Sequence, residues 1–317
     1  LSGLRSRAGA KDEALQSLDD ALEEDPTRSA DWSSKARIHL ELGEHDEALI
    51  ASEACLSLDR QNGDAWAIKA QVLKDRPSEA KAALKAAVHA VALAAGGTEL
   101  ILLKSDLLAV NGKPEEGRDS LITALEKNPT DSTLRAAMAA MSLQKGNLEE
   151  AGELLRGTPL EAMDEPLIHI QWGRLHLASA DLQRDGTGDT DMRLLLVAKE
   201  SFDEAVRLNR EHGIAWLGLA RIQRLLKDKE AAALSLTRAS RLLEEDQPAY
   251  STEAALLALD NDDIAEAERL IENASIHDNR SATIPYIKGN IASARGRFEV
   301  ARSFYSETLA IEPNHSR

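Results

Sequence analysis

Histidine is the first residue type to test for chemistry in this chain, because an imidazole can bind a metal or act as a general base. Of the eight histidines, only His169 and His176 lie close together on one expected helix. Seven residues of helix rise about 10.5 Å, which is too far for two ligands of one zinc ion. The pair therefore predicts helix packing, and the sequence predicts no metal and no cofactor.

An acidic segment within residues 182–194 suggests calcium chemistry instead. Asp185, Gly186, Gly188, Asp189 and Asp191 lie close together there. Their spacing does not match the twelve-residue calcium loop, which ends in a glutamate. We expect an inserted, solvated loop between two helices, with contact to a partner protein as the alternative.

Nucleophilic chemistry has a single cysteine candidate, Cys55, which occupies a position that other parts of the chain fill with small packing residues. A packing role is therefore expected for its thiol. The sequence contains no phosphate-binding glycine loop, no nucleophile elbow and no HExxH pattern. These observations predict that the chain is not an enzyme.

The charge balance excludes further classes of function. With 54 acidic and 38 basic residues the net charge is −16, and aromatic residues make up only 3%. Nucleic-acid binding needs clustered Lys and Arg, often with aromatic platforms, so neither nucleic acid nor an anionic membrane is an expected partner. Neither a membrane-length apolar stretch nor a targeting signal is visible, which predicts a soluble protein of the cytoplasm or periplasm.

The elements that must position any site follow from an internal repeat of 34 residues. Residues 9–15 (GAKDEAL) recur as residues 43–49 (GEHDEAL). With Ala14 as a marker, the same position falls on Ala48, Ala80, Gly117, Ala151, Ala198, Ala232, Ala267 and Ala301. Such a period is typical of arrays of helix pairs, in which each unit buries its apolar face on its neighbours.

Three columns of this repeat predict how the helices pack. The position twelve residues before the marker holds small residues when the third and sixth units are aligned by Trp66 and Trp172, which places Ala70 and Gly173 there. The position seven after the marker holds small residues throughout. The position four after the marker is nearly always large and apolar, with Phe202 and Tyr305 as its aromatic members. Small residues let two antiparallel helices approach closely, and the large residues fill the space beside the crossing. Glycines such as Gly9, Gly43, Gly112, Gly146 and Gly296 are expected to end the first helix of a unit.

The pattern resembles the tetratricopeptide repeat family. The motif residues are Trp32, Lys35, Ala36, Gly43, Ala48 and Cys55, the weaker Trp66, Lys69 and Ala70, and Trp216, Leu219, Ala220, Ala232 and Ala239. The resemblance implies an all-α fold: a right-handed α-solenoid of about nine antiparallel helix pairs, forming a single domain over residues 1–317. The chain is also expected to be a piece of a longer protein, because its first unit lacks an opening turn.

Two places depart from the period. The unit near residues 63–97 lacks its turn glycine and contains Pro77. Its second helix is expected to continue through Ala95 to the pair Gly96 and Gly97. The other departure is the loop within residues 182–194.

In the resembling family, the first helices of successive units line a concave groove. The apolar residues predicted to face it here are Leu102, Leu143, Ile170, Leu177 and Leu217. A basic cluster of Arg174, Arg221 and Arg224 lies beside them. These arginines either receive a carboxylate or acidic side chain of a partner, or pair with Glu and Asp of their own solenoid.

The predicted function is a non-enzymatic scaffold that binds a protein or peptide segment in this groove. The alanine-rich units are similar in style to bacterial envelope scaffolds, including those of exopolysaccharide export. The alternative is the recruiting or regulatory region of a larger enzyme, such as a transferase, whose catalytic domain lies outside this chain. Self-association through the solenoid ends is a further expectation.

Overall fold

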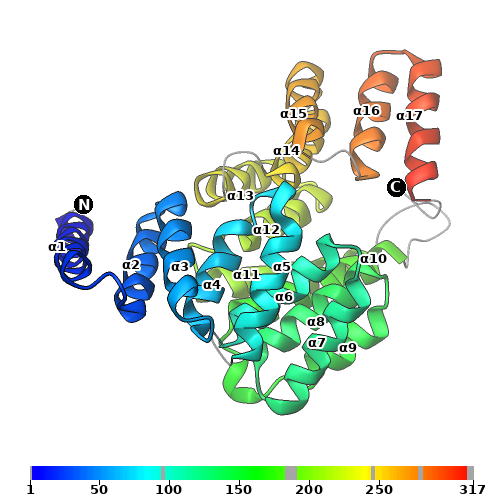
Figure 1. Cartoon of the computed structure of the whole chain (residues 1–317). Coiled ribbons are helices and arrows are strands. Elements are labelled where there is room, and N and C mark those ends of the chain that lie inside the picture. The colour runs from blue at the N-terminus through cyan, green and yellow to red at the C-terminus, as the bar shows by residue number, and fades with distance from the viewer. Residues whose placement is uncertain (1, 94–96, 183–190, 244–246, 278–280, 313–317) are drawn as a thin grey trace. The chain divides into compact units, whose positions relative to one another are not determined.

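The computed structural model describes residues 2–93, 97–182, 191–243, 247–277 and 281–312. In these residues the regular structure consists of 17 α-helices and two short 3-10 helices, without a strand (Figure 1). The predicted all-α fold class is therefore confirmed. None of the described helices is both long and apolar enough to cross a membrane.

The chain forms two compact units, Leu1–Met138 and Ala139–Arg317, and the division falls within one helix, α8. A single solenoid over residues 1–317 therefore stays a prediction. The first unit contains α1 (Ser2–Glu24), α2 (Ser29–Leu42), α3 (His45–Leu58), α4 (Gly63–Leu73), η1 (Pro77–Glu79), α5 (Ala80–Ala92), α6 (Gly97–Val110), α7 (Pro114–Lys127) and the start of α8 (Ser132–Gln144).

The second unit continues from α8 with nine further described α-helices. These are α9 (Leu148–Arg156), η2 (Leu160–Ala162), α10 (Pro166–Leu182), α11 (Met192–Leu208), α12 (Gly213–Leu225), α13 (Lys229–Leu242), α14 (Pro248–Asp260), α15 (Ile264–His277), α16 (Thr283–Ala294) and α17 (Phe298–Ile311). Within each unit successive helices pack as pairs, such as α4 with α5 and α12 with α13.

Glycine ends several first helices, as the sequence predicts. Gly43, Gly112, Gly146 and Gly296 have φ angles between +70° and +79°. The Glu44 amide then donates to the carbonyl oxygen of His39 (2.9 Å), which satisfies a carbonyl at the helix end. A residue with a Cβ is strained in this left-handed conformation, so glycine defines where the chain turns back.

The prediction of a helix end at Gly9 is wrong. The helix α1 runs without a break from Ser2 to Glu24. Within a helix a glycine costs only about 1 kcal/mol relative to alanine, so a glycine alone does not force a turn. The described residues therefore contain eight helix pairs and the single helix α1, instead of nine pairs.

The predicted extension of the helix in the irregular unit is also wrong. The helix α5 ends at Ala92, and the Leu93 amide donates to the carbonyl oxygens of His89 (3.1 Å) and Ala90 (3.2 Å). This tightened last turn satisfies the helix-end carbonyls before the glycine pair is reached. Ala95 and Gly96 lie outside the described residues, and α6 begins at Gly97.

The small-residue columns form the helix crossings. From Ala36 onward, every described residue of the columns twelve before and seven after the marker is buried. Glycine replaces alanine where the facing side chain is aromatic. A Cβ on Gly173 would lie 2.6 Å from Phe202, and one on Gly289 would lie 2.4 Å from Tyr305. Within a unit, a larger side chain four residues after the marker is thus accompanied by a smaller residue at the position twelve before it, as close packing requires.

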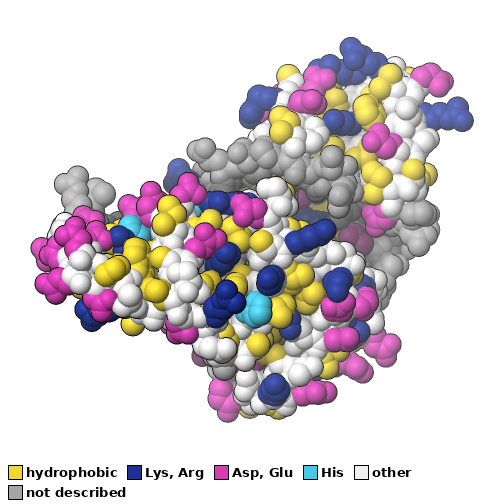
Figure 2. Space-filling view, viewed as in Figure 1, with side chains coloured by type: hydrophobic (Ala, Val, Ile, Leu, Met, Phe, Trp, Pro, Cys, Tyr) yellow, Lys and Arg dark blue, Asp and Glu magenta, His cyan; other side chains and the backbone are white. Residues whose placement is uncertain are grey.

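Acidic residues are concentrated at α1. Figure 2 shows Asp and Glu side chains gathered over this end of the first unit. The contributing residues are Asp12, Glu13, Asp19, Asp20, Glu23, Glu24 and Asp25. Two of the acidic groups in this region form ion pairs, Asp19 with Lys35 and Glu41 with Lys11 (2.8 Å), and the remaining charge faces solvent.

Candidate functional site

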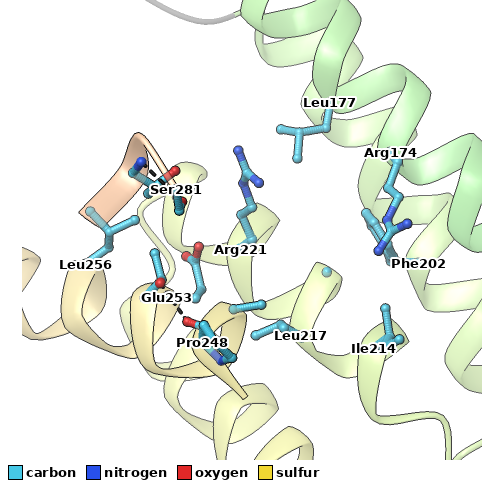
Figure 3. Close-up of a pocket in the computed structure, with 14 residues that line it drawn as sticks. Arg174, Leu177, Phe202, Ile214, Leu217, Arg221, Pro248, Glu253, Leu256 and Ser281 are labelled. Carbon is cyan, nitrogen blue, oxygen red and sulfur yellow. Dashed lines mark hydrogen bonds between the residues drawn. The ribbon is translucent and has the colours of Figure 1, made fainter. Parts of the chain in front are cut away.

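A cavity of about 310 Å³ opens in the second unit, where α10, α12 and α14 present their side chains to one space (Figure 3). These are the first helices of three successive pairs. The lining residues are Arg174, Leu177, Phe202, Ile214, Leu217, Gly218, Arg221, Pro248, Ala249, Thr252, Glu253, Leu256, Ser281 and Thr283. A cavity of this size holds one or two side chains of a bound segment.

Phe202 forms the floor of this cavity. Its ring comes from α11 and is almost fully buried, with 2% of the residue exposed. A Cβ on Gly173 of α10 or on Gly218 of α12 would lie 2.6 Å or 2.2 Å from this ring. The two glycines therefore let the aromatic ring fill the space between α10 and α12 and support the apolar wall around Leu217.

Arg174 is the available cation of the site. The residue is exposed and makes no hydrogen bond or ion pair with another described residue. Figure 3 shows its side chain beside Phe202, with Arg221 standing between Leu177 and Ser281. Partial desolvation in the hollow and the nearby charge of Arg221 lower the pKa of Arg174. An anion bound to Arg174 would stabilise its positive charge and so offset both the desolvation and the repulsion from Arg221.

Arg221 has only a distant carboxylate. Its Nη2 lies 4.0 Å from Oδ2 of Asp181, and its side chain is 31% exposed. This separation is the limit for an ion pair, and such partly exposed pairs contribute at most about 1 kcal/mol. Arg221 therefore retains donors that point toward the cavity.

Arg224 is paired with carboxylates of its own chain. Its Nε hydrogen-bonds to Oε1 of Glu253, and its Nη1 lies 3.4 Å from Oδ2 of Asp260. The side chains of Arg224 and Glu253 are only 12% and 8% exposed. Burial opposes the charge of Arg224, but the two carboxylates outweigh it and raise the pKa of the guanidinium. The sequence left two alternatives for the arginines, binding of a partner's carboxylate or pairing with Glu and Asp of the same chain. Arg224 pairs with carboxylates of the same chain.

The five apolar residues that were predicted to face the groove do not lie together in the structure. Leu177 and Leu217 line the cavity with Arg174 and Arg221. Ile170 is 1% exposed and packs in the core of the second unit, so it presents no surface to a partner. Leu143 lies on α8 outside the lining, and Leu102 lies on α6 of the first unit.

The sequence prediction missed several lining residues. They are Phe202, Ile214, Gly218, Glu253 and Leu256. One signal was present: an aromatic residue four after the marker, with a glycine at the small position of the same unit. The sequence contains no comparable signal for Glu253. Its pairing depends on which arginine of the preceding repeat lies next to it after folding.

Models of the tetratricopeptide repeat family match residues 32–62, 192–246 and 252–316. The matched residues belong to tetratricopeptide repeats. The cavity is lined by residues of α11, α12 and α14, which lie largely within the matched repeats, and by residues of α10, which precedes them.

Solved structures of low identity share this repeat fold. A tetratricopeptide repeat protein from Parabacteroides merdae is 12% identical, with a TM-score of 0.56 over 93% of this chain and 99% of that one. The human IFIT1 dimer solved with m7Gppp-AAAA is 16% identical, with a TM-score of 0.55 over 94% and 76%. At these identities the likeness shows the fold alone.

One curated relative is similar in sequence. Anaphase-promoting complex subunit 7 of Dictyostelium discoideum is 31% identical over 150 residues, which are 44% of this chain and 26% of the relative. The chain therefore spans about a quarter of the length of the curated relative it matches.

His169 and His176, the two neighbouring histidines of α10, both have partners within their own segment of the chain. The rings of His176 and Trp172 stack with centroids 5.5 Å apart, and burial lowers the pKa of His176. A ring nitrogen of His169, Nε2, lies 2.7 Å from the carbonyl oxygen of Met163. Among the described residues no group of three or more His, Cys, Asp and Glu side chains could hold a metal ion.

Cys55 is a packing residue in its repeat. Its side chain is fully buried against Trp32, Ala65 and Trp66. Burial, followed by the charges of Asp59 and Asp64, raises the pKa of the thiol to about 11. A thiolate is therefore scarce at neutral pH.

The predicted inserted loop lies largely outside the described residues. Residues 183–190, with Asp185, Gly186, Gly188 and Asp189, belong to this part. Of the acidic residues of the loop, Asp191 is described: its Oδ1 accepts a hydrogen bond from the Arg193 amide (2.8 Å) and caps α11.

Proposed function

We propose that the second unit docks a segment of a partner protein in the cavity between α10, α12 and α14, and that this segment presents a carboxylate to Arg174. The observation that carries the proposal is an exposed guanidinium without a described partner, placed above an apolar floor. Arginine can bind a carboxylate through two parallel hydrogen bonds, which fixes the orientation of the bound group.

The apolar wall supplies the second part of the recognition. Leu177, Leu217 and Leu256 surround the space above Phe202. A large apolar side chain of the partner would bury its surface there at about 25 cal/mol per Å². The segment that fits best therefore carries an apolar anchor close to an acidic residue or a terminal carboxylate.

The experiment begins with affinity capture by the natural full-length protein, followed by mass spectrometry to identify the partner segment. Its affinity is then measured for the wild type and for the double variant Arg174→Glu with Arg221→Glu. We expect the double variant to bind about 10–100-fold more weakly, because two attractive charges become repulsive.

A matched control separates this effect from net charge. Arg297 and Arg302 are exposed residues of the same unit, away from the cavity, and Arg297→Glu with Arg302→Glu makes the same change in net charge. The control is expected to bind as the wild type does. Equal affinity of the Arg174 and Arg221 double variant and the wild type would contradict the proposal.

We further propose that the scaffold serves a multiprotein assembly, such as a bacterial envelope or exopolysaccharide-export complex. The alanine-rich units support a scaffold, and the curated relative carries the name of a complex subunit. The alternative is a recruiting region of a larger enzyme, such as a transferase. Finding a catalytic domain in the natural protein beyond these residues would favour the alternative.

Self-association is a separate proposal, supported by α17. Phe298 and Leu309 lie three turns apart on this terminal helix and are 70% and 50% exposed. Light scattering over a range of concentrations should show mass increasing for the wild type. The variant Phe298→Glu with Leu309→Glu should stay monomeric, and an equal mass for both proteins would contradict this proposal.

A further inference from the structure

A second cavity, of about 650 Å³, lies in the same unit and shares no lining residue with the first. It is formed by the end of α11, the turn before α12, and the end of α13. We call it the outer arginine site. Its lining residues are Asp203, Val206, Arg207, Arg210, Glu211, Trp216, Arg238, Arg241 and Leu242.

Four arginines surround this cavity, and three of them have no side-chain partner among the described residues. Arg207 is held by both carboxylate oxygens of Glu204 (2.7 and 2.6 Å). The side chains of Arg210, Arg238 and Arg241 are exposed and make no hydrogen bond or ion pair with a described residue. In a chain of net charge −16, this concentration of cations without a described partner is a local reversal of sign.

The repeat explains how the cations come together. Arg207 and Arg241 occupy equivalent positions one 34-residue repeat apart, and stacking brings equivalent positions of neighbouring units side by side. The other units carry neutral, acidic or histidine residues there: Glu23, Ser57, His89, Glu126, Leu160, Ile276 and Ala310. The basic surface is thus confined to the two units that form this cavity.

Helix capping accounts for only part of this charge. A cation in the last turn stabilises a helix by about 0.3–1 kcal/mol, and Arg207 and Arg241 lie in last turns. Arg238 lies one turn earlier, and Arg210 follows the end of α11. The helix dipole stabilises these two arginines only weakly. Their positive charges therefore remain available to bind another group.

An apolar surface accompanies the arginines. The Trp216 indole donates from Nε1 to the Arg210 carbonyl oxygen (2.8 Å), which fixes the ring at the wall of the cavity. Leu242 is 38% exposed, and Leu234, about two turns earlier on α13 and outside the lining of the cavity, is 71% exposed. The buried face of α13 is a different one, so the exposed face is both cationic and apolar.

We propose that the outer arginine site binds an acidic protein segment that carries a large apolar side chain. The carboxylates would pair with Arg210, Arg238 and Arg241, and the apolar side chain would pack on Trp216 and Leu242. A lipid headgroup or a nucleic-acid phosphate would use the arginines and leave the apolar wall uncovered. The long-range repulsion of a chain of charge −16 also disfavours extended polyanions.

The test uses the whole chain and a fluorescein-labelled peptide made of repeated Glu-Glu-Leu-Glu blocks, followed by fluorescence anisotropy. The variant Arg238→Glu with Arg241→Glu should bind about tenfold more weakly than the wild type. The matched control Arg297→Glu with Arg302→Glu should bind as the wild type does. Circular dichroism of both variants establishes that they are folded.

Two altered peptides test the two parts of the recognition. Replacing every Glu by Gln, or every Leu by Ser, should each reduce the affinity by at least about tenfold. Equal binding of the Arg238 and Arg241 double variant and the wild type would overturn the proposal, and so would equal binding of the Leu-free peptide. Binding to phosphatidylserine vesicles or to single-stranded RNA without binding to the acidic peptide would assign the site to a different ligand and likewise overturn it.

Discussion

Two arginines of the second unit, Arg174 and Arg224, differ in whether the guanidinium group has a partner within the described residues. On the side of α10, Arg174 is exposed and has no described partner. On α12, outside the lining of the cavity, Arg224 is buried and hydrogen-bonded to Glu253 of α14. Both arginines lie on first helices of their repeats and both were predicted to face the groove.

The difference arises in the following repeat. The helix α14 brings Glu253 and Asp260 to Arg224, whereas Arg221 on α12 meets only Asp181 at the limit of an ion pair. The repeated helix-pair architecture therefore does not decide whether a cation is available. The side chains of the next unit decide it, by supplying or withholding a carboxylate.

The largest expected effect concerns the floor of the cavity. The substitution Gly218→Ala places a Cβ about 2.2 Å from the Phe202 ring and should lower the free energy of unfolding by about 3 kcal/mol. Urea denaturation measures this loss. Gly152→Ala is the control, because its Cβ would meet a movable Arg156 side-chain end at 3.2 Å and the helix would gain propensity.

A second-site change sharpens this prediction. Phe202→Leu removes the ring atoms that meet the new methyl group, so the double variant Gly218→Ala with Phe202→Leu should be more stable than the sum of the two single effects implies. Additive losses would mean that Gly218 is required for a reason other than the ring.

The next effect compares the two carboxylates. Glu253→Gln leaves the buried Arg224 with a weaker partner and should lower the free energy of unfolding by about 2 kcal/mol. Asp181→Asn, at the longer and more exposed pair with Arg221, should cost less than about 0.5 kcal/mol. Similar losses of unfolding free energy for the two variants would show that the Arg224–Glu253 and Arg221–Asp181 pairs do not differ in strength.

The same Asp181→Asn substitution should strengthen binding. Removing the carboxylate near Arg221 leaves this guanidinium more available to an acidic partner segment, and we expect about a twofold gain in affinity at low salt. Isothermal titration with the captured partner segment measures it. An affinity that falls instead would indicate that Asp181 orients Arg221 for binding.

The smallest expected effect is on pH dependence. Burial, and to a lesser extent the charge of Arg174, lowers the pKa of His212, whose Nδ1 is buried without a partner in the structure. The unfolded chain then binds a proton near pH 6.5 while the folded state resists it, so stability should fall as the pH drops below about 6.5. Urea denaturation at several pH values should show a smaller fall for His212→Gln.

Much of the fold follows from the spacing of small residues. The buried columns, the left-handed glycines at helix ends and the packing role of Cys55 were all predictable, because each depends on local sequence and on the repeat. The break at Gly9 and the extension of α5 were predicted wrongly. In both cases the sequence contains glycine, but local hydrogen bonding and packing decide whether a helix continues.

The site was only partly predictable. Arg174, Arg221, Leu177 and Leu217 could be placed from the repeat register, whereas Phe202 and Gly218 depend on one another across helices. The outer arginine site was missed, because its residues come from two repeats and from the turn between them. Its signal in the sequence is the recurrence of arginine at Arg207 and Arg241.

By itself, the sequence determined that this chain is an acidic array of tetratricopeptide repeats without recognisable catalytic residues, because a period of 34 and its small columns allow close helix pairs. The tertiary structure decided which charges are left for a partner. Packing brings carboxylates from the next repeat to Arg224 and brings none of the described ones to Arg174 or Arg238, and residues that distant in sequence become neighbours only when the repeats stack.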